Sequence, residues 1–290
     1  MMKKILLMGA MSVAVAACGN QEANDAPADA PDSTAAVEEA KMDKADDTKM
    51  ADAGLCVDFG PQTPRDISGA TGLNLADFPF APPPAQMNLC NIHTHTNAEH
   101  KGPGFNIFVN DSDSGGYACN GTPDLTDAEL ASAPGAYGGV KPGDTIEVHW
   151  VHTTCDTTPG EGLGACVPAS CTNPSLRVEA QTFLVVNDAD AADFTEMAYR
   201  GNMVDGMHQA KMIPSDTGEP VVFRGSTTGP SYTQAVCSPA QVTWSVRPQC
   251  TKLDINSLHR WAESGNAFNE TKSHGVRQLV TAPELLSPIN

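Results

Sequence analysis

The chain is divided into short β-rich runs by stretches that are rich in glycine and proline. Its 290 residues include 25 glycines and 22 prolines, and proline is kept out of helix interiors and central strands. The runs between these stretches are rich in β-branched and aromatic residues, which favour strands. We therefore expect strands over residues 89–96, 105–109, 145–152, 176–186, 221–223 and 241–246.

Helical patterns are scarce in the same sequence. The two better candidates are residues 191–199 and 255–262, each with Asp or Asn near its start, where a side-chain oxygen can cap a helix. No internal repeat or second linker interrupts residues 56–290, so the sequence predicts a single, mainly β (α+β) domain with few short helices. Gly/Pro-rich stretches that we expect to be loops cover residues 79–84, 112–142 and 159–174.

The balance of charge excludes one class of partner. The formal charge is −18, from 17 basic and 35 acidic residues, and an acidic surface repels phosphate. Aromatic residues make up only 6% of the chain, so few side chains are available to stack on bases. We therefore expect no nucleic-acid partner.

The beginning of the chain has the pattern of a secretion signal. Lys3 and Lys4 precede an uncharged apolar run over residues 5–17, which is too short to cross a bilayer as a helix. The run ends in Val-Ala-Ala-Cys18, which resembles the lipobox of bacterial lipoproteins, where the signal is cleaved before a cysteine that then carries lipid. This resemblance implies a signal peptide over residues 1–17; the alternative is an ordinary signal peptide with an incidental cysteine.

The segment after the lipobox predicts where the protein is held. Residue 19 is glycine rather than aspartate, which in such lipoproteins favours the outer membrane, with the protein facing the periplasm or the cell surface. Residues 18–55 have almost no branched apolar side chains, so we expect a disordered acidic tether. A partner-binding tail is the alternative, but no motif supports it. The folded domain then covers residues 56–290.

Eight cysteines remain after Cys18, at positions 56, 90, 119, 155, 166, 171, 237 and 250. An even number of cysteines in an exported chain indicates disulfides. Their spacing alone selects none of the possible pairings. A cysteine metal site is disfavoured, because Cys166 and Cys171 are the only close pair and no Cys-x-x-Cys occurs.

Histidine is concentrated in or just after two of the predicted strands, which together account for five of the eight histidines. In a strand, side chains two residues apart point to the same face. His93 and His95 therefore present two imidazoles on one face of the first strand. Glu99 falls on that face too if the strand continues.

The second strand supplies a further imidazole. Glu147 and His149 share one of its faces, whereas His152 is out of phase. With His93 and His95, His149 completes a set of three histidines on a rigid sheet, leaving one tetrahedral position open, as in catalytic zinc sites. A ligating imidazole usually donates its other N–H to a carboxylate or carbonyl, and Glu147 is placed for such a role.

The competing interpretation is that these histidines form only the polar face of an exposed strand. A lone His-x-His pattern is often no more than that. The second histidine-bearing strand, with carboxylates in register, favours a metal site instead. Imidazole ligands with an open position suit Zn²⁺ best, with Co²⁺, Cd²⁺ and Fe²⁺ as alternatives.

Four blocks of the sequence resemble segments of α-type carbonic anhydrases. Residues 93–95 (His-Thr-His) and 147–152 (Glu-Val-His-Trp-Val-His) resemble the two strands that supply the zinc histidines in that family. Residues 60–67 resemble its Gln-Ser-Pro entry segment. The family's Ser-Leu-Thr-Thr-Pro-Pro-Cys-Ser…Val-x-Trp block is resembled by residues 224–230, 237–238 and 242–244.

Departures from the α class point to a particular subgroup. Glu99 follows His95 by only four residues, and a Gly/Pro/Asp-rich insertion lengthens the chain between His95 and His149. Ser226 stands where a leucine normally lines the substrate pocket, and Gly-Pro rather than Pro-Pro follows the Thr-Thr pair. These features are similar to the δ-class carbonic anhydrases of diatoms and their bacterial relatives, with the α class as the nearest alternative. The resemblance implies a central, largely antiparallel sheet.

The resemblance implies a carbonate dehydratase, a lyase that reversibly hydrates CO₂ to bicarbonate with a metal-bound hydroxide. His93, His95 and His149 would hold the zinc, which lowers the pKa of bound water to about 7. Glu147 would orient His149. An apolar wall for uncharged CO₂ would be formed by Val151, Val242 and Trp244.

Hydroxyl groups have implied roles in the same reaction. Thr227 would accept a hydrogen bond from the hydroxide and donate its own proton to Glu99, so that a lone pair points at CO₂. Thr228 would contact bicarbonate. His100 and His152 match histidines that are structural in the family.

Proton release and one disulfide complete what the resemblance implies. The family's shuttle histidine precedes the first zinc strand, but residues 68–89 contain no histidine. Protons would leave through buffer or through a histidine from elsewhere, the unplaced ones being His208, His259 and His274. The resemblance also pairs Cys56 with Cys237 and leaves the other six cysteines open. The implied partners are CO₂, bicarbonate and, through the N-terminal lipid, a membrane.

Two other functions compete with this one. His93-x-His95-x₃-Glu99 also fits the first metal motif of cupins, in which Glu99 would be a ligand with His149 in a dioxygenase or isomerase. Residues 141–149 resemble the second cupin motif only faintly, and a cupin explains neither the Thr-Thr block nor the entry segment. The other alternative is a non-catalytic, anhydrase-like binding domain, which the presence of all three histidines disfavours.

Overall fold

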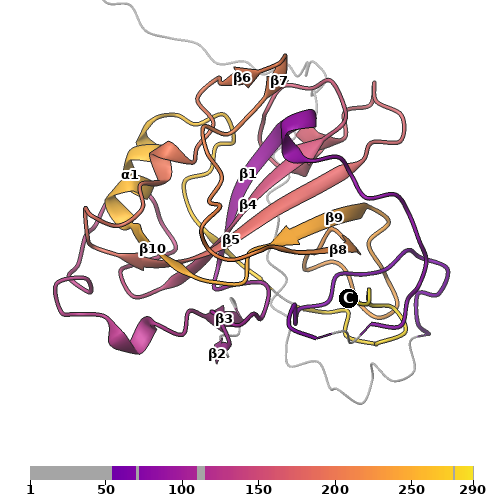
Figure 1. Ribbon diagram of the computed structural model, residues 1–290, viewed down its shortest axis with the longest axis horizontal. Coiled ribbons are helices and arrows are strands. Elements are labelled where there is room, and N and C mark those ends of the chain that lie inside the picture. The colour runs from indigo at the N-terminus through magenta and orange to yellow at the C-terminus, as the bar shows by residue number, and fades with distance from the viewer. Residues whose placement is uncertain (1–53, 70–71, 110–114, 277, 290) are drawn as a thin grey trace, which may run out of the picture. The chain divides into compact units, whose positions relative to one another are not determined.

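The computed structural model describes residues 54–69, 72–109, 115–276 and 278–289. Three long strands run side by side at its centre (Figure 1): β1 (Asn88–Thr96), β4 (Thr145–Thr153) and β5 (Leu176–Val186). β1 pairs with β4, and β4 pairs with β5, in both cases antiparallel. These strands carry both histidine-bearing segments of the sequence.

Further strands extend this sheet. β9 (Gln241–Val246) runs parallel to β5, and β8 (Val221–Ser226) runs antiparallel to β9. β10 (Thr251–Asp254) pairs in parallel with the end of β5, and β11 (His274–Gly275) pairs in parallel with β1. The result is a mixed, seven-stranded sheet in which β1, β4 and β5 are the longest strands. The predicted mainly β fold around a central sheet is confirmed.

Shorter elements surround the sheet. α1 (Ile255–Glu263) begins after Asp254, whose side chain accepts a hydrogen bond from the backbone N–H of Asn256 (3.1 Å). Two hairpins pair β2 (Ile107–Val109) with β3 (Gly116–Ala118), and β6 (Met203–Val204) with β7 (Met207–His208). The described 3₁₀ helices are η2 (Pro84–Gln86), η3 (Thr122–Asp124), η4 (Leu163–Cys166) and η5 (Phe194–Glu196).

The central sheet is buried on both faces. On one face, Val148 and Trp150 of β4 lie in one hydrophobic cluster with Trp261 of α1. On the other face, Val151 and Trp244 lie in a second cluster. Because side chains of a strand alternate between its faces, each residue of β4 is assigned to one of these two environments.

Most predicted strands agree with the structure to within two residues. The predictions over 176–186 and 241–246 coincide with β5 and β9, and β8 continues for three residues beyond the predicted 221–223. The prediction of a loop throughout residues 112–142 was wrong, because β3 lies within that stretch. β3 has only three residues, and the first of them is Gly116. It is therefore too short to show the alternation of apolar and polar residues by which a strand is recognised in a sequence.

The predicted helix over residues 191–199 was wrong, since only the short η5 is present there. Backbone groups of this segment bond to distant parts of the chain instead. The Ala192 N–H donates to the Lys252 carbonyl (3.1 Å), and the Ala198 carbonyl accepts from the Lys211 N–H (3.1 Å). These tertiary hydrogen bonds replace the local ones that an α-helix would make.

Four disulfides join the eight cysteines. Cys56 is bonded to Cys237, the pair that the family resemblance implies. Cys90 of β1 is bonded to Cys166 of η4, which ties a Gly/Pro-rich loop to the sheet. The remaining two bonds are Cys119–Cys250 and Cys155–Cys171.

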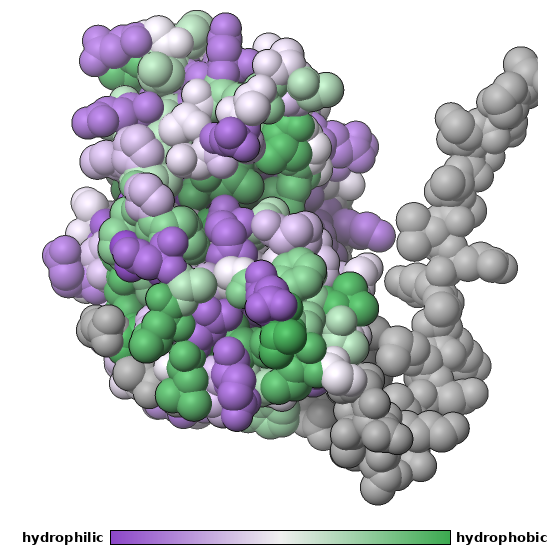
Figure 2. Space-filling view, turned by 90° about the vertical axis from the view of Figure 1, so that its right-hand side faces the viewer, coloured by the Kyte–Doolittle hydropathy of each residue, from purple (hydrophilic) through white to green (hydrophobic). Residues whose placement is uncertain are grey.

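The predictions for the N-terminal segments lie outside the described residues. These are the signal peptide over residues 1–17, lipidation of Cys18 and all but the end of the tether. No helix in the described part of the chain is long and apolar enough to cross a membrane. On the face shown in Figure 2, hydrophobic residues lie interspersed with hydrophilic ones.

Candidate metal centre

Three histidines converge where β1 pairs with β4. The antiparallel register places His93 directly opposite His149, and His95 lies two residues further along β1. His93 Nε2 lies 3.3 Å from His149 Nδ1, and the ring centroids of His95 and His149 are 4.6 Å apart. One nitrogen from each ring lies within 4.8 Å of the other two. The structure therefore brings together the three histidines that the strand pattern singled out.

The arrangement fits a tetrahedral metal ion. Zinc–nitrogen bonds are about 2.0–2.1 Å long, so two ligand nitrogens of a tetrahedral site are about 3.3 Å apart. The nitrogens of His93 and His149 have this separation. His95 and His149 are buried, whereas His93 is partly exposed. The histidine cluster is therefore reached by solvent on the side of His93.

Each of the three histidines has a polar group near its outer nitrogen, by which we mean the ring nitrogen that would not bind the metal. Such a partner sets the tautomer of a ligating imidazole and orients its ring. One of these partners, Asn91, was not predicted from the sequence, although it stands two residues before His93 on the same strand. The contacts are Asn91 Oδ1 to His93 Nδ1 (2.7 Å), Glu99 Oε2 to His95 Nδ1 (3.0 Å) and Glu147 Oε1 to His149 Nε2 (3.6 Å).

Glu99 reaches the histidines without being part of β1. The strand ends at Thr96, and Asn97 adopts a left-handed backbone conformation (φ 63°). The strand thus does not continue to Glu99, and the condition under which Glu99 would share the face of His93 and His95 along the strand is not met. The turn is held instead by Glu147, whose Oε2 accepts hydrogen bonds from the backbone N–H groups of Glu99 and His100.

Burial and neighbouring charges set the protonation state of the site. Burial and the adjacent imidazoles hold the pKa of His93 well below its usual value. Burial alone would raise the pKa of Glu99, but Arg65 and the neighbouring histidines hold it well below its usual range. Burial likewise opposes ionisation of Glu147, and His100 keeps the pKa of that carboxyl low. A neutral His93 near two ionised carboxylates favours a divalent cation.

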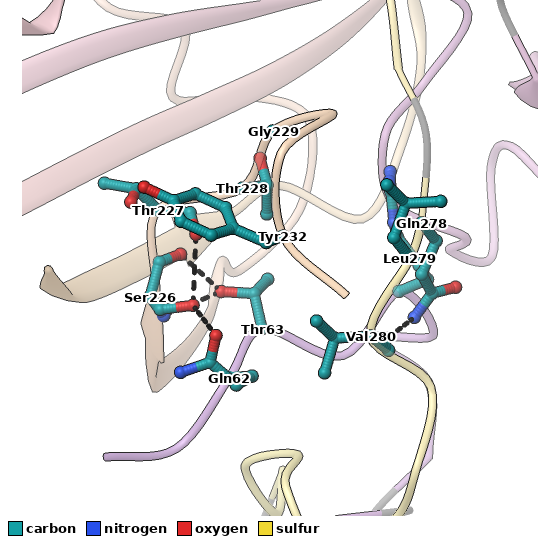
Figure 3. Close-up of a pocket in the computed structure, with 11 residues that line it drawn as sticks. Gln62, Thr63, Ser226, Thr227, Thr228, Gly229, Tyr232, Gln278, Leu279 and Val280 are labelled. Carbon is teal, nitrogen blue, oxygen red and sulfur yellow. Dashed lines mark hydrogen bonds between the residues drawn. The ribbon is translucent and has the colours of Figure 1, made fainter. Parts of the chain in front are cut away.

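Thr227 and Thr228 line a small polar pocket (Figure 3). Its cavity volume is about 20 Å³, which is room for a molecule the size of water, and Arg65 also lines it. Thr227 Oγ1 lies 2.6 Å from Ser238 Oγ. Among the described residues, no hydrogen bond joins Thr227 to Glu99, so the predicted hydrogen bond from the Thr227 hydroxyl to Glu99 stays a prediction.

The predicted apolar wall is buried on the histidine-bearing face of the sheet. The ring centroid of Trp244 lies 5.1 Å from that of His149, and its Nε1–H donates to the carbonyl of Ser226 (3.1 Å). Val151 and Val242 belong to the same hydrophobic cluster as Trp244. Trp244 therefore provides the direct contact between this cluster and the site.

His274 is an unplaced histidine that the structure brings to the site. β11 carries it alongside β1, and its ring centroid lies 4.9 Å from that of His95. The side chain of His274 is half exposed, and its partial desolvation and the neighbouring imidazoles lower its pKa to about 4, so it is neutral at pH 7. A two-residue strand has no periodicity, so no sequence signal pointed to this contact. His208 and His259 lie elsewhere, in β7 and α1.

Comparison with known proteins decides the family. Residues 84–257 match the family model described as delta carbonic anhydrase, which is more than half of the chain. The chain belongs to the delta carbonic anhydrase family. It is therefore a carbonic anhydrase, as the sequence blocks predicted, and the matched region contains all three converging histidines. No curated protein matches the sequence of this carbonic anhydrase.

Three solved structures with similarity to this carbonic anhydrase are described as carbonic anhydrases. The α-carbonic anhydrase of Thermovibrio ammonificans is 16% identical (TM-score 0.26; 76% of this chain and 84% of that chain covered). The α-carbonic anhydrase of Photobacterium profundum is 18% identical (TM-score 0.27; 77% and 88% covered). A hyperthermostable carbonic anhydrase from an active hydrothermal vent chimney is 16% identical (TM-score 0.27; 78% and 87% covered).

Buried His152 makes the stability of the metal-free carbonic anhydrase depend on pH. Burial lowers the pKa of His152 to about 4, whereas in the unfolded chain it is about 6.5. Between these values the unfolded chain binds the extra proton, so the free energy of unfolding should fall by roughly 3 kcal/mol as the pH drops from about 6.5 to about 4. Urea unfolding across this range measures the slope. His152→Gln should remove this contribution and so reduce the slope, while His93 and His274, whose pKa values are also lowered, maintain the rest. An unchanged slope in that variant would contradict the prediction.

Proposed function

We propose that this carbonic anhydrase hydrates CO₂ reversibly to bicarbonate with Zn²⁺ held by His93, His95 and His149. The observation that carries the proposal is the convergence of one nitrogen from each ring within 4.8 Å. Three imidazoles leave the fourth tetrahedral position for water. When bound there, zinc lowers the pKa of its water to about 7 and so supplies hydroxide near neutral pH. Co²⁺, Cd²⁺ and Fe²⁺ are alternatives that the same ligands accept.

The residues around the histidines orient the reaction. Glu147 holds the outer nitrogen of His149. Thr227 would accept a hydrogen bond from the nucleophile that attacks CO₂ and would donate its own hydroxyl hydrogen to Glu99 in a second hydrogen bond. Its contact with Ser238 (2.6 Å) is compatible with this role when the Ser238 hydroxyl is the donor. Thr228 contacts bicarbonate. The apolar side of the site, against which uncharged CO₂ rests, is formed by Val151, Val242 and Trp244.

The geometry disfavours a cupin-type site in which Glu99 is a fourth ligand. Glu99 Oε2 lies 3.0 Å from Nδ1 of His95, which is the outer nitrogen of that ring. The group of converging ligand atoms at this point consists of His93, His95 and His149 without Glu99. Glu99 therefore supports a ligand rather than serving as one.

The decisive experiment is a stopped-flow CO₂ hydration assay of the chain before and after removal of metal by a chelator. The zinc-loaded protein should accelerate hydration, the metal-free protein should not, and added Zn²⁺ should restore the rate because it refills the histidine site. Added Mg²⁺ is the control, since Mg²⁺ prefers oxygen ligands. No hydration by protein shown to contain a full equivalent of zinc would refute the proposal.

Export and lipid anchoring form a second part of the proposal. The basic residues, the apolar run and Cys18 support cleavage and lipidation at the start of the chain. Four disulfides in the folded domain favour an oxidising compartment such as the periplasm. In this arrangement the acidic segment tethers the enzyme to the outer membrane.

A further inference from the structure

Arg65 is a buried guanidinium that lies between the polar pocket and the histidine cluster. The residue is 7% exposed and lines the pocket together with Thr227. Its Nη1–H donates to the backbone carbonyl of Glu99 (2.7 Å). Backbone hydrogen bonds also join the segment of Arg65 to the segment that follows Glu99. The Lys101 N–H donates to the Arg65 carbonyl (2.7 Å), and the Ile67 N–H donates to the Lys101 carbonyl (2.9 Å). Arg65 is therefore fixed at both its backbone and its side chain.

The carboxylate of Glu99 connects Arg65 to a histidine of the site. Glu99 is fully buried. Its Oε1 lies 3.8 Å from Arg65 Nη1, and its Oε2 lies 3.0 Å from His95 Nδ1. A buried carboxylate is costly unless an opposite charge is paired with it. The guanidinium therefore stabilises an ionised carboxylate that lies 3.0 Å from Nδ1 of His95.

A buried ion pair with a purely structural role needs no histidine beside its carboxylate. Arg177 and Glu179 of β5 form such a pair, with both side chains largely buried. The pair of Arg65 and Glu99 differs because its carboxylate also faces His95. This difference makes the Arg177 pair a matched control.

We propose that Arg65 is a positioning residue of the metal centre, which holds Glu99 so that the ring of His95 presents its Nε2 to the metal. The inference rests on the proposed function, because it takes His95 as a metal ligand. An acceptor at Nδ1 keeps the imidazole proton there and leaves the lone pair of Nε2 for the metal. The segment that carries Arg65 thus contributes to metal affinity although it supplies no ligand.

The test is a double-mutant cycle on zinc affinity, measured by competition with a chromophoric chelator. Arg65→Gln and Glu99→Gln should each weaken zinc binding roughly 10- to 100-fold, the range for lost partners of ligating histidines. If Arg65 acts through Glu99, the double variant should bind zinc no more weakly than Glu99→Gln alone. Additive losses, or unchanged affinity in Arg65→Gln, would overturn the proposal.

A spectroscopic readout separates positioning from general damage to the fold. In the Co²⁺-loaded protein, the visible absorption spectrum reports the geometry around the metal. It should change in Arg65→Gln and stay as in the parent in Arg177→Gln, which should also keep the parent's zinc affinity. An unchanged spectrum in Arg65→Gln, or the same change in both variants, would count against a positioning role.

Folding and the proposed function are controlled separately. If circular dichroism shows that Arg65→Gln does not fold, Arg65→Lys replaces it in the cycle, because lysine keeps the buried charge but lacks the planar fork of donors. The expected coupling to Glu99→Gln is the same, and additive losses again overturn the proposal. A parent chain that binds no zinc would refute the proposed function itself, whereas a zinc-binding, active parent with unaffected variants would refute only the role of Arg65.

Discussion

The His95→Ala enzyme is expected to lose the zinc that we propose it binds and to hydrate CO₂ no faster than the uncatalysed reaction. Within the described part of the chain, His95 is one of the three rings whose nitrogens converge within 4.8 Å at this site. Its removal leaves two ligands, fewer than catalytic or structural zinc sites use. Without the metal, no group in the site is able to supply hydroxide at neutral pH. Metal analysis of the purified variant and a stopped-flow hydration assay measure the two effects.

Two further variants show whether this loss is specific to a ligand. Glu99→Ala should weaken zinc binding roughly 10- to 100-fold but still bind zinc at saturation, because Glu99 faces the outer nitrogen of His95. In a cupin-type site, Glu99→Ala would remove the metal as completely as His95→Ala. His208→Ala is the matched control, since His208 lies in β7 outside the histidine cluster. Full zinc occupancy in His95→Ala would contradict the assignment of the site.

Removing the Cys119–Cys250 disulfide is expected to lower the free energy of unfolding by about 4–5 kcal/mol. The bond joins residues that are 131 positions apart, and the unfolded chain gains most entropy when a long loop is opened. Cys119 is fully buried beside Leu184 and Val186, so alanine is the least disruptive replacement. Urea unfolding of the Cys119→Ala/Cys250→Ala variant measures the loss, which corresponds to a Tm lower by roughly 10 °C.

The Cys155–Cys171 bond provides the internal comparison for this disulfide. It closes a sequence separation of only 16, for which the same reasoning gives about 3 kcal/mol. Neither bond involves β1, and neither contacts the converging histidines, so both variants should keep zinc affinity and activity well below their Tm. A larger loss of stability from the short loop than from the long one would contradict the entropic explanation.

The faces of the histidine strands could be predicted because they follow from local geometry. Side chains two residues apart in β1 share a face for any strand that forms there, so His93 and His95 were placed together correctly. The same period put His149 with Glu147 and left His152 out of phase. Only the pairing of β1 with β4 decides that His93 stands opposite His149.

Contacts from distant segments could not be predicted in the same way. Arg65 comes from the entry segment and His274 from the two-residue strand β11, and neither position has a periodic pattern. Glu99 reaches His95 through a turn with Asn97 in a left-handed conformation, not along an extended strand. Each of these placements depends on long-range hydrogen bonds and packing rather than on neighbouring residues.

The misplaced helix has the same origin. Residues 191–199 have a helical pattern, yet their backbone groups bond to Lys252 and Lys211. By contrast, α1 forms as predicted, because Asp254 caps it and Trp261 packs into the hydrophobic cluster that also contains Trp150. Local pattern prevails where tertiary contacts agree with it and fails where they compete.

The sequence by itself determined the main strands, the faces of the histidines and the presence of eight cysteines after Cys18. These properties depend on residue type and on the two-residue period of a strand. The tertiary structure alone decided the three disulfide pairings that the resemblance left open, the convergence of three nitrogens within 4.8 Å and the link from Arg65 through Glu99 to His95. These depend on which distant segments meet, and that is settled by burial and pairing across the whole sheet.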